Sequence, residues 1–215
     1  MAYPVSKIVV PPIYKLWIRK VKGIGNIPHD KPFIVAINHS SYYDILIMPC
    51  ILVPKLNKKM HTLVNSSYWK NPITKFFLDL WGGIPVFVKN ENDSKQKNKL
   101  ALERALNHIN HGDIIMIFPE GTRSLDGKLQ KAKTGVARLA LLSKAPVLPV
   151  GIIGSYKVLP KGNFFPRFAR CEVKIGKLMS FERYLNKKTS NKVYEKITKD
   201  IMKQIAKLIG QKYNY

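Results

Sequence analysis

The chain has 215 residues, 46% of them hydrophobic, which suffices for one domain with a buried core and excludes an intrinsically disordered protein. It carries 37 Lys and Arg against 13 Asp and Glu, a net charge of +24 spread along the chain, so we expect a polyanionic partner such as a membrane, an acidic substrate or nucleic acid. With two cysteines, Cys50 and Cys171, and no apolar run of 18 residues, we expect neither a disulfide framework nor a transmembrane helix.

The first 22 residues combine apolar side chains, including Trp17, with lysine and arginine, and Pro11-Pro12 divides the run into two pieces. This composition predicts a helical segment that lies in a membrane interface, although a helix packed on the core fits the same pattern. The prolines and the lack of a small-residue cleavage site argue against a signal peptide. We therefore divide the chain into an N-terminal amphipathic, membrane-associating segment, residues 1–22, and one domain, residues 23–215.

The rest of the chain alternates between apolar, strand-like runs and amphipathic, helical runs. This alternation predicts the α/β class, with a single domain whose mostly covered β-sheet is flanked by helices. We expect a helix from Ser94, as its N-cap, to His111, because apolar residues recur at helical spacing and Gly112 ends the run. The other expected strands and helices are strands at 33–37, 61–65, 84–88, 114–118, 147–153 and 171–175, and helices from Ser41 or Asp44 to Leu52, at 72–80, 131–143 and 193–209.

The first of these strands, at 33–37, is followed by Asn38 and His39, and an aspartate follows at Asp44. On one helix the two residues would lie about 140° apart, but across a strand-to-helix turn their side chains can meet. The carboxylate then holds one ring nitrogen and leaves the other to accept a proton, as in a general base. The alternative is a loop histidine beside ordinary helix caps. The other histidines are scattered and expected to be structural, so no metal site is predicted.

A second polar run, FPEGTRS at residues 118–124, follows the apolar strand at 114–117. Its proline and glycine predict a turn at the carboxyl end of that strand, where α/β proteins commonly bind ligands. Glu120 can accept a hydrogen bond from a substrate hydroxyl, and the planar guanidinium of Arg123 can bind a phosphate through two hydrogen bonds. The alternative is a turn that only caps the next helix.

Taken together, NHSSYYD at 38–44 and FPEGTRS resemble the glycerolipid acyltransferases of the 1-acylglycerol-3-phosphate (lysophosphatidate) acyltransferase type. GIPVFVK at 83–89 and VLPVGIIG at 147–154 are similar to the family's two other motifs, and the run from Lys133 to its lysine-glycine helix start. The resemblance covers roughly residues 20–160. One difference is Lys89, where the family usually has arginine. Lysine keeps the charge but cannot form the two parallel hydrogen bonds that arginine makes to a phosphate.

The resemblance implies transfer of a fatty acyl chain from acyl-CoA or acyl carrier protein, as co-substrate, to the free hydroxyl of lysophosphatidate. The product would be phosphatidate, in phospholipid biosynthesis, and no cofactor or metal is expected. The residues with a role by this resemblance are catalytic His39 and Asp44, and substrate-binding Glu120, Gly121, Thr122, Arg123, Lys89 and Lys133.

The resemblance also gives the charge a partner, because the lysophospholipid acceptor and both donors are anionic and the acceptor lies in a membrane. We expect peripheral binding to the cytoplasmic face of an anionic membrane surface. The same chemistry on glycerol-3-phosphate, another lysophospholipid or a non-phosphorylated lipid stays open, as does an inactive membrane-binding relative. A basic nucleic-acid-binding protein is a more remote alternative; without zinc-finger spacing, an RNA-recognition motif or a basic zipper, we expect no nucleic acid partner.

Overall fold

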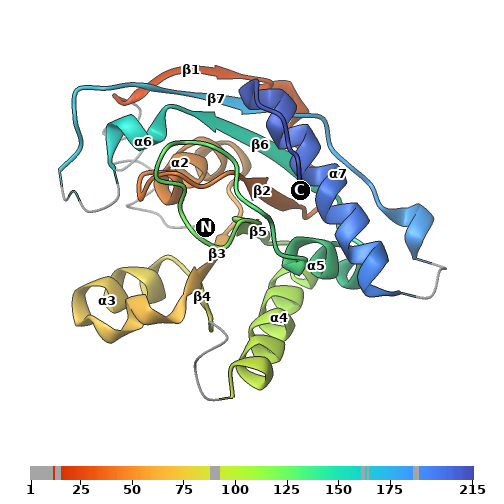
Figure 1. The fold of residues 1–215 in the computed structure, drawn as a ribbon. Coiled ribbons are helices and arrows are strands. Elements are labelled where there is room, and N and C mark those ends of the chain that lie inside the picture. The colour runs from red at the N-terminus through yellow and green to blue at the C-terminus, as the bar shows by residue number, and fades with distance from the viewer. Residues whose placement is uncertain (1–11, 13–15, 88–92, 161–162, 164, 186–188) are drawn as a thin grey trace.

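A single seven-stranded sheet runs through the part of the chain that the structure describes (Figure 1). The computed structural model describes residue 12 and residues 16–87, 93–160, 163, 165–185 and 189–215. The strands are β1 (Ile18–Lys22), β2 (Ile34–Ile37), β3 (Met60–Asn65), β4 (Gly83–Val86), β5 (Ile114–Ile117), β6 (Val147–Ile153) and β7 (Cys171–Ile175). The helices are α2 (Asp44–Leu56), α3 (Pro72–Leu80), α4 (Ser94–Asn110), α5 (Gly135–Ser143), α6 (Ser155–Val158) and α7 (Asn191–Ile209), with 3-10 turns η1 (Ile24–Asn26), η2 (Ser66–Lys70) and η3 (Glu182–Tyr184).

The strand order is β1-β7-β6-β2-β5-β3-β4. The central strand β2 pairs in parallel with β5 and β6, and β3 pairs in parallel with β5 and β4. Only β7 and its parallel neighbour β1 run the other way, since β6 and β7 are antiparallel. The carboxyl ends of β2, β3, β5 and β6 therefore meet at one edge of the sheet, the usual place for a ligand site in such folds.

Both faces of the sheet are covered, as the alternation of strands and helices predicted. In β2, Ile34 and Ala36 face the core formed with α4, α5 and α7, while Val35 and Ile37 face the core formed with α2. Figure 1 shows α7 lying across β6. Gly151 of β6 allows this close approach, because a Cβ there would lie 2.6 Å from Cγ2 of Ile209.

The strands expected at 147–153 and 171–175 are confirmed at every residue, whereas several helix ends differ. The helix expected to end at Leu52 continues through Pro54 to Leu56, because its buried face packs on the sheet and outweighs the hydrogen bond that proline cannot donate. The helix expected from residue 131 begins at Gly135. Asp93, without a side-chain cap bond, precedes Ser94 as the N-cap of α4.

The N-terminal segment differs from its prediction where it is described. Residues 18–22 form the edge strand β1 and not a helix, so they belong to the domain that was expected to begin at residue 23. Trp17 packs edge-on against the ring of Tyr43, at 6.1 Å between centroids, and its Nε1 donates to the carbonyl oxygen of Arg167. The rest of the expected interfacial helix lies almost wholly outside the described residues. Among the described helices, none is both long enough and apolar enough to cross a membrane.

Candidate active site

The turn between β2 and α2 brings His39 and Asp44 together, as the sequence predicted. Nδ1 of His39 lies 3.0 Å from Oδ2 of Asp44. Because a carboxylate accepts hydrogen bonds, this contact places the ring proton on Nδ1 and leaves a lone pair on Nε2. The ring also stacks on Phe118, at 4.0 Å between centroids, which fixes its plane.

Asp44 organises the whole turn in addition to holding the histidine. Its side chain is fully buried, and Oδ2 also accepts hydrogen bonds from the backbone N–H groups of Ser40 and Ser41, each at 2.7 Å. These two donors fix the carboxylate in place. Asp44 therefore presents a fixed negative charge to His39, at the first residue of α2 where a negative charge is also favourable.

Asn38 anchors the turn to the sheet. Its side-chain amide donates to the carbonyl oxygen of Ile152 at 2.9 Å and accepts from the backbone N–H of Ile152 at 2.7 Å. The amide therefore continues the ladder between β2 and β6 by one step beyond the last residue of the strand. The position of His39 is set by this rigid attachment to the central strands.

Glu120 takes a different position from the one expected. It is 2% exposed, its Oε1 accepts the backbone N–H of His39, and its Oε2 accepts the backbone N–H of Gln130, both at 2.8 Å. Burial raises the pKa of Glu120 to about 7, against the effect of the two N–H donors, and the Asp44 charge adds to the rise. With both oxygens occupied by backbone groups, Glu120 positions the histidine loop and does not face an acceptor.

Arg123 lies beside the histidine turn, held by two tyrosines that sequence reasoning did not select. Its guanidinium stacks on the ring of Tyr42 at 3.5 Å from the centroid, and Nη2 donates to the hydroxyl of Tyr68 at 3.3 Å. Burial raises the pKa of Tyr68 to about 12, so the phenol stays neutral. Nη1 of Arg123 is buried and has no hydrogen-bond partner among the described residues. A buried guanidinium N–H of this kind favours an anionic ligand.

The turn after β5 depends on glycine. Gly121 has a φ of +67°, and a Cβ there would lie 3.1 Å from both Cε and Nζ of Lys133. The lysine side chain therefore crosses directly over the turn, and its ammonium group adds positive charge beside Gly121. Both exposed residues, Gly121 and Thr122, line the same hollow as Arg123.

This hollow is a pocket of ≈ 240 Å³ at the carboxyl edge of the sheet. One part of its wall is polar and includes the imidazole of His39 and the guanidinium of Arg123, while another part is apolar. The lining residues are His39, Tyr42, Ile45, Leu63, Val64, Asn65, Ser67, Tyr68, Phe118, Gly121, Thr122 and Arg123. A proton acceptor, an anion-binding group and an apolar wall thus share one pocket, which suits an amphiphilic substrate that carries a hydroxyl and a phosphate.

Of the residues selected from sequence, the structure brings together His39, Asp44, Gly121, Thr122, Arg123 and Lys133. Lys89 lies outside the described residues, so its role stays a prediction. Tyr42 lies inside NHSSYYD, three residues after His39, so its position in the sequence was a local signal that it could line the site. Tyr68 and Gln130 carry no local signal, because only the fold brings them to the site.

The comparisons with known proteins agree with this geometry. A family model described as Acyltransferase matches residues 18–153, a range that contains both polar runs. A chloroplastic 1-acyl-sn-glycerol-3-phosphate acyltransferase from Brassica napus is 27% identical over 152 residues, which cover 70% of this chain and 42% of that protein. A 1-acyl-sn-glycerol-3-phosphate acyltransferase from Bacillus subtilis is 27% identical over 135 residues, which cover 63% of this chain and 62% of that protein. The chain thus matches less than two thirds of the length of these relatives.

Among solved structures, the fold is similar to that of the 1-acyl-sn-glycerophosphate acyltransferase PlsC from Thermotoga maritima. The TM-score is 0.66 at 25% sequence identity, and the match covers 99% of this chain and 84% of that one. The similarity therefore extends beyond the motifs to the arrangement of the whole domain. Because the family model matches more than half of its residues, the chain belongs to the acyltransferase family.

Proposed function

We propose that this protein transfers a fatty acyl chain from an acyl thioester to the free hydroxyl of lysophosphatidate, giving phosphatidate for phospholipid synthesis. The observation that carries this proposal is the shared pocket: the imidazole of His39, held by Asp44, lines the same hollow as Arg123, whose Nη1 is buried without a partner among the described residues. The similarity to lysophosphatidate acyltransferases from plants and bacteria supports the same acceptor.

In the proposed reaction, Nε2 of His39 takes the proton from the acceptor hydroxyl while the hydroxyl oxygen attacks the thioester carbonyl carbon. The imidazolium that forms is stabilised by the Asp44 carboxylate 3.0 Å away. When the tetrahedral intermediate collapses, the carbon–sulfur bond breaks and His39 returns the proton to the leaving thiolate. An ester and a free thiol result, and the reaction needs no cofactor. The proposed donor is acyl-CoA or acyl carrier protein.

The phosphate of the acceptor is proposed to bind Arg123, with Lys133 contributing charge across Gly121. Lys89, which resembles the arginine of a family motif, is proposed to help on the basis of sequence. The apolar part of the pocket, at Ile45 and Leu63, would contact the hydrocarbon next to the reacting group.

We further propose that the protein binds an anionic membrane peripherally, on its cytoplasmic face, and that α3 contributes to the contact. Ile73 and Phe76 of α3 are 68% and 63% exposed, and Phe77 and Leu80 are exposed beside them. Figure 1 shows α3 projecting at the β4 end of the sheet. Its Thr74 donates to the carbonyl oxygen of Tyr68, which lines the pocket, so this apolar face adjoins the active site.

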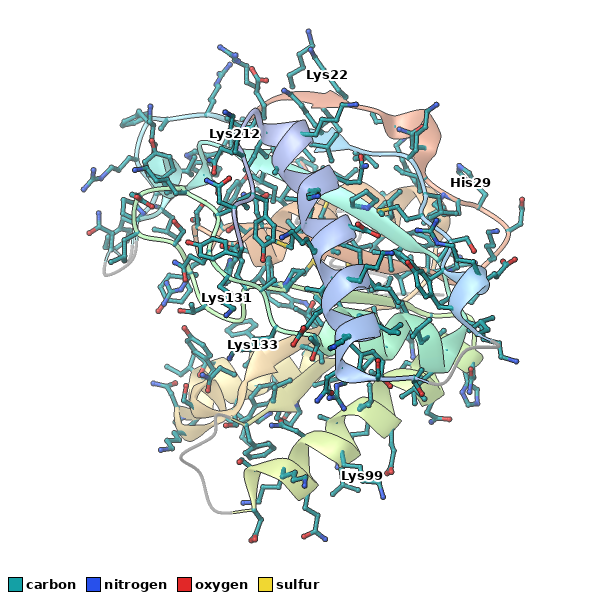
Figure 2. The ribbon with its side chains drawn as sticks, turned by 45° about the vertical axis from the view of Figure 1, so that its right-hand side comes forward. Lys22, His29, Lys99, Lys131, Lys133 and Lys212 are labelled. Carbon is teal, nitrogen blue, oxygen red and sulfur yellow. The ribbon has the colours of Figure 1, made fainter. Side chains whose placement is uncertain are left out.

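Charge supports an anionic partner, because basic residues project from many elements. Figure 2 shows Lys22 on β1, Lys99 on α4, Lys131 and Lys133 after β5, and Lys212 after α7. Each such group near an anionic leaflet contributes roughly 1 kcal/mol. An exposed apolar face on a chain with this positive charge favours a lipid surface over nucleic acid, which offers no apolar layer.

Activity tests the first proposal. Thiol release from a long-chain acyl-CoA, with lysophosphatidate in mixed micelles, is expected to require the acceptor and to disappear in His39→Ala. His29→Ala, at an exposed histidine, is the matched control and is expected to keep full activity. Release that survives His39→Ala would refute the assigned base. If the wild type prefers glycerol-3-phosphate, another lysophospholipid or a non-phosphorylated lipid in an acceptor panel, the proposed acceptor is wrong.

Vesicle sedimentation tests the membrane proposal. Replacing Ile73 and Phe76 together by serine is expected to weaken binding at least roughly tenfold, since burying each side chain contributes about 1.5–3 kcal/mol. Leu100→Ser, at an exposed leucine on α4, is the control. Binding to anionic vesicles is expected to fall in about 1 M salt, where the screening length is about 3 Å. Unchanged binding of the double variant would remove α3 from the interface, and tighter binding to duplex DNA would overturn the lipid partner.

A further inference from the structure

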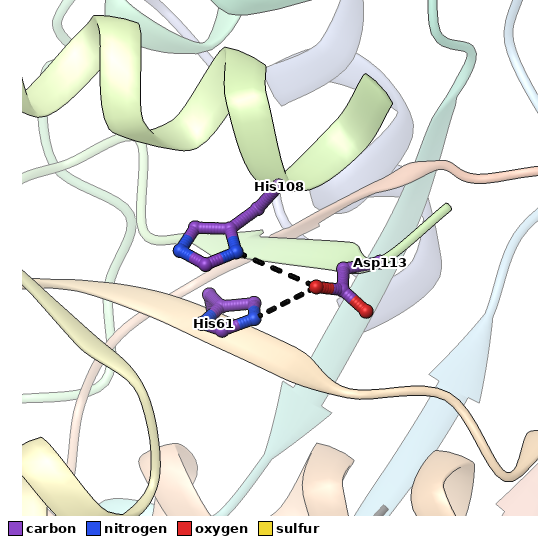
Figure 3. A group of neighbouring side chains, drawn as sticks. All are labelled: His61, His108 and Asp113. Atoms are coloured by element: carbon purple, nitrogen blue, oxygen red, sulfur yellow. Dashed lines mark hydrogen bonds and ion pairs between the residues drawn. The ribbon is translucent and has the colours of Figure 1, made fainter. Parts of the chain in front are cut away.

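Three side chains far apart in sequence converge at the opposite edge of the sheet from the active site. His61 comes from the start of β3, His108 from the last turns of α4, and Asp113 from the residue before β5 (Figure 3). Oδ2 of Asp113 lies 3.1 Å from Nε2 of His61 and 3.4 Å from Nδ1 of His108. The three potential ligand atoms all lie within 4.8 Å of one another. The sequence reading treated the histidines as scattered and structural, but the fold places these two ring against ring, at 3.5 Å between centroids.

Both ring nitrogens of His61 face hydrogen-bond acceptors. Its side chain is 7% exposed, and its two ring nitrogens face two acceptors: Nδ1 lies 3.0 Å from the carbonyl oxygen of Gly82, and Nε2 faces Asp113. A neutral imidazole has one N–H, so it satisfies only one of these contacts. With the proton on Nδ1, the lone pair of Nε2 points at a carboxylate, which is repulsive unless a proton or a metal ion lies between them.

A metal ion satisfies this arrangement better than a proton does. A second proton would make His61 a cation stacked directly on His108, and it would leave His108 with only a long contact to an oxygen already in use. A metal ion instead accepts lone pairs from both rings and from the carboxylate, provided that the two stacked rings rotate until both nitrogens point at it. Nδ1 of His108 already faces the same carboxylate oxygen, so it is placed to share an ion with His61 and Asp113.

We propose that His61 Nε2, His108 Nδ1 and Asp113 Oδ2 bind a divalent transition-metal ion, for which Zn²⁺ is the best chemical match. Two imidazoles and a carboxylate are typical ligands of this ion. The bond from Nδ1 of His61 to the Gly82 carbonyl is the kind of outer contact that orients metal-binding histidines. Asp113 and His108 are 21% and 35% exposed in their side chains, so solvent can complete the coordination.

The position of the site indicates a structural role. The ligands join β3, α4 and the start of β5, and Gly82 adds the turn between α3 and β4. β3 reaches the pocket only at its other end, through Leu63, Val64 and Asn65. The metal would therefore hold the β3-β4 edge of the sheet to α4 without touching the reacting groups, and it is independent of the proposed acyl transfer.

Metal titration of the full chain, freed of any histidine tag and stripped with a chelator, tests this inference. We expect one equivalent of Zn²⁺ to bind by calorimetry and to raise the melting temperature, and Co²⁺ to give visible absorption bands. His108→Ala, at a partly exposed position, and the isosteric Asp113→Asn should each weaken binding by at least roughly a hundredfold. His111→Ala, at an exposed histidine outside the cluster, should leave binding unchanged.

The inference is overturned if the stripped wild-type chain binds no Zn²⁺ at micromolar concentration, or if both cluster variants bind it as tightly as the wild type. Loss of binding in the His111→Ala control to the same extent would also refute the assigned ligands. Nitrogen NMR of the stripped protein gives a second readout. Both ring nitrogens of His61 protonated, and unchanged by Zn²⁺, would show that a proton holds the cluster together.

Discussion

Replacing Asp44 by asparagine removes one charge while keeping the shape of the side chain. The amide oxygen can take the place of Oδ2 and still accept from His39, Ser40 and Ser41, while the amide nitrogen replaces Oδ1, which is buried without a partner among the described residues. What is lost is the attraction between a carboxylate and the imidazolium that forms during proton transfer. At 3.0 Å, with an effective dielectric constant of about 20, this attraction is worth about 5 kcal/mol, which sets an upper limit near 10⁴-fold in rate.

Because the two backbone donors already share the carboxylate charge, we expect kcat to fall by about 10²–10⁴-fold. The Michaelis constant for lysophosphatidate should change little, since Asp44 is buried behind His39 and does not line the pocket. Steady-state thiol release measures both constants, and circular dichroism checks the fold. Asp30→Asn, at an exposed aspartate, is the matched control. A folded Asp44→Asn variant that keeps kcat within about threefold would refute the role of this charge.

Three further changes separate recognition, electrostatics and packing. Arg123→Lys keeps the charge but loses the planar guanidinium that can donate two hydrogen bonds to one phosphate. The Michaelis constant for lysophosphatidate should therefore rise by about tenfold or more, while that for a non-phosphorylated acceptor should stay unchanged. Equal effects on both constants would contradict a phosphate contact. The folded-state pKa of Glu120 is about 7, above its ordinary 4.5, so its contribution to stability is present below about pH 4.5 and lost as the pH rises through 7. Between pH 5 and pH 8, the unfolding free energy of Glu120→Gln, measured with urea, should therefore rise by up to about 3 kcal/mol relative to that of the wild type. The same difference between variant and wild type at both pH values would contradict this. Gly151→Ala should cost about 1–3 kcal/mol of unfolding free energy, because α7 must move away from a new Cβ at 2.6 Å from Ile209; no measurable cost would contradict the close packing.

Much of the fold could be predicted because its central strands are buried on both faces. Val147–Ile153 is a nearly continuous apolar run, and such a run is typical of a strand that is buried on both faces of a sheet. The strand β1 was not predicted because it lies exposed at an edge of the sheet. Ile18–Lys22 reads IRKVK, an exposed edge strand in which three basic residues discourage further pairing, and this pattern fits a basic amphipathic helix as well.

The site was predictable where its residues are close in sequence and not where the fold alone joins them. The contact between His39 and Asp44 follows from a strand-to-helix turn, which the sequence indicates locally. The direction of the Glu120 side chain could not be predicted in this way, because a side chain at a turn can face the pocket or the core. Only the buried backbone N–H groups of His39 and Gln130 determine it. Residues 61 and 108 meet through strand pairing and helix packing, which no local pattern contains.

The two polar runs of this sequence are one structural unit. Glu120 accepts the backbone N–H of His39, and the backbone carbonyl oxygen of His39 accepts from the N–H of Ser124, at 2.8 Å in each case. Neither run can hold its position without the other, since each satisfies backbone groups that the turn at the other strand leaves unpaired. The geometry therefore separates two roles: buried carboxylates fix the loop that carries His39, and the half-buried Arg123, which lines the pocket, is available for the proposed contact with the acceptor. Changes at Glu120 should consequently appear in kcat and in stability, whereas changes at Arg123 should appear in the choice of substrate.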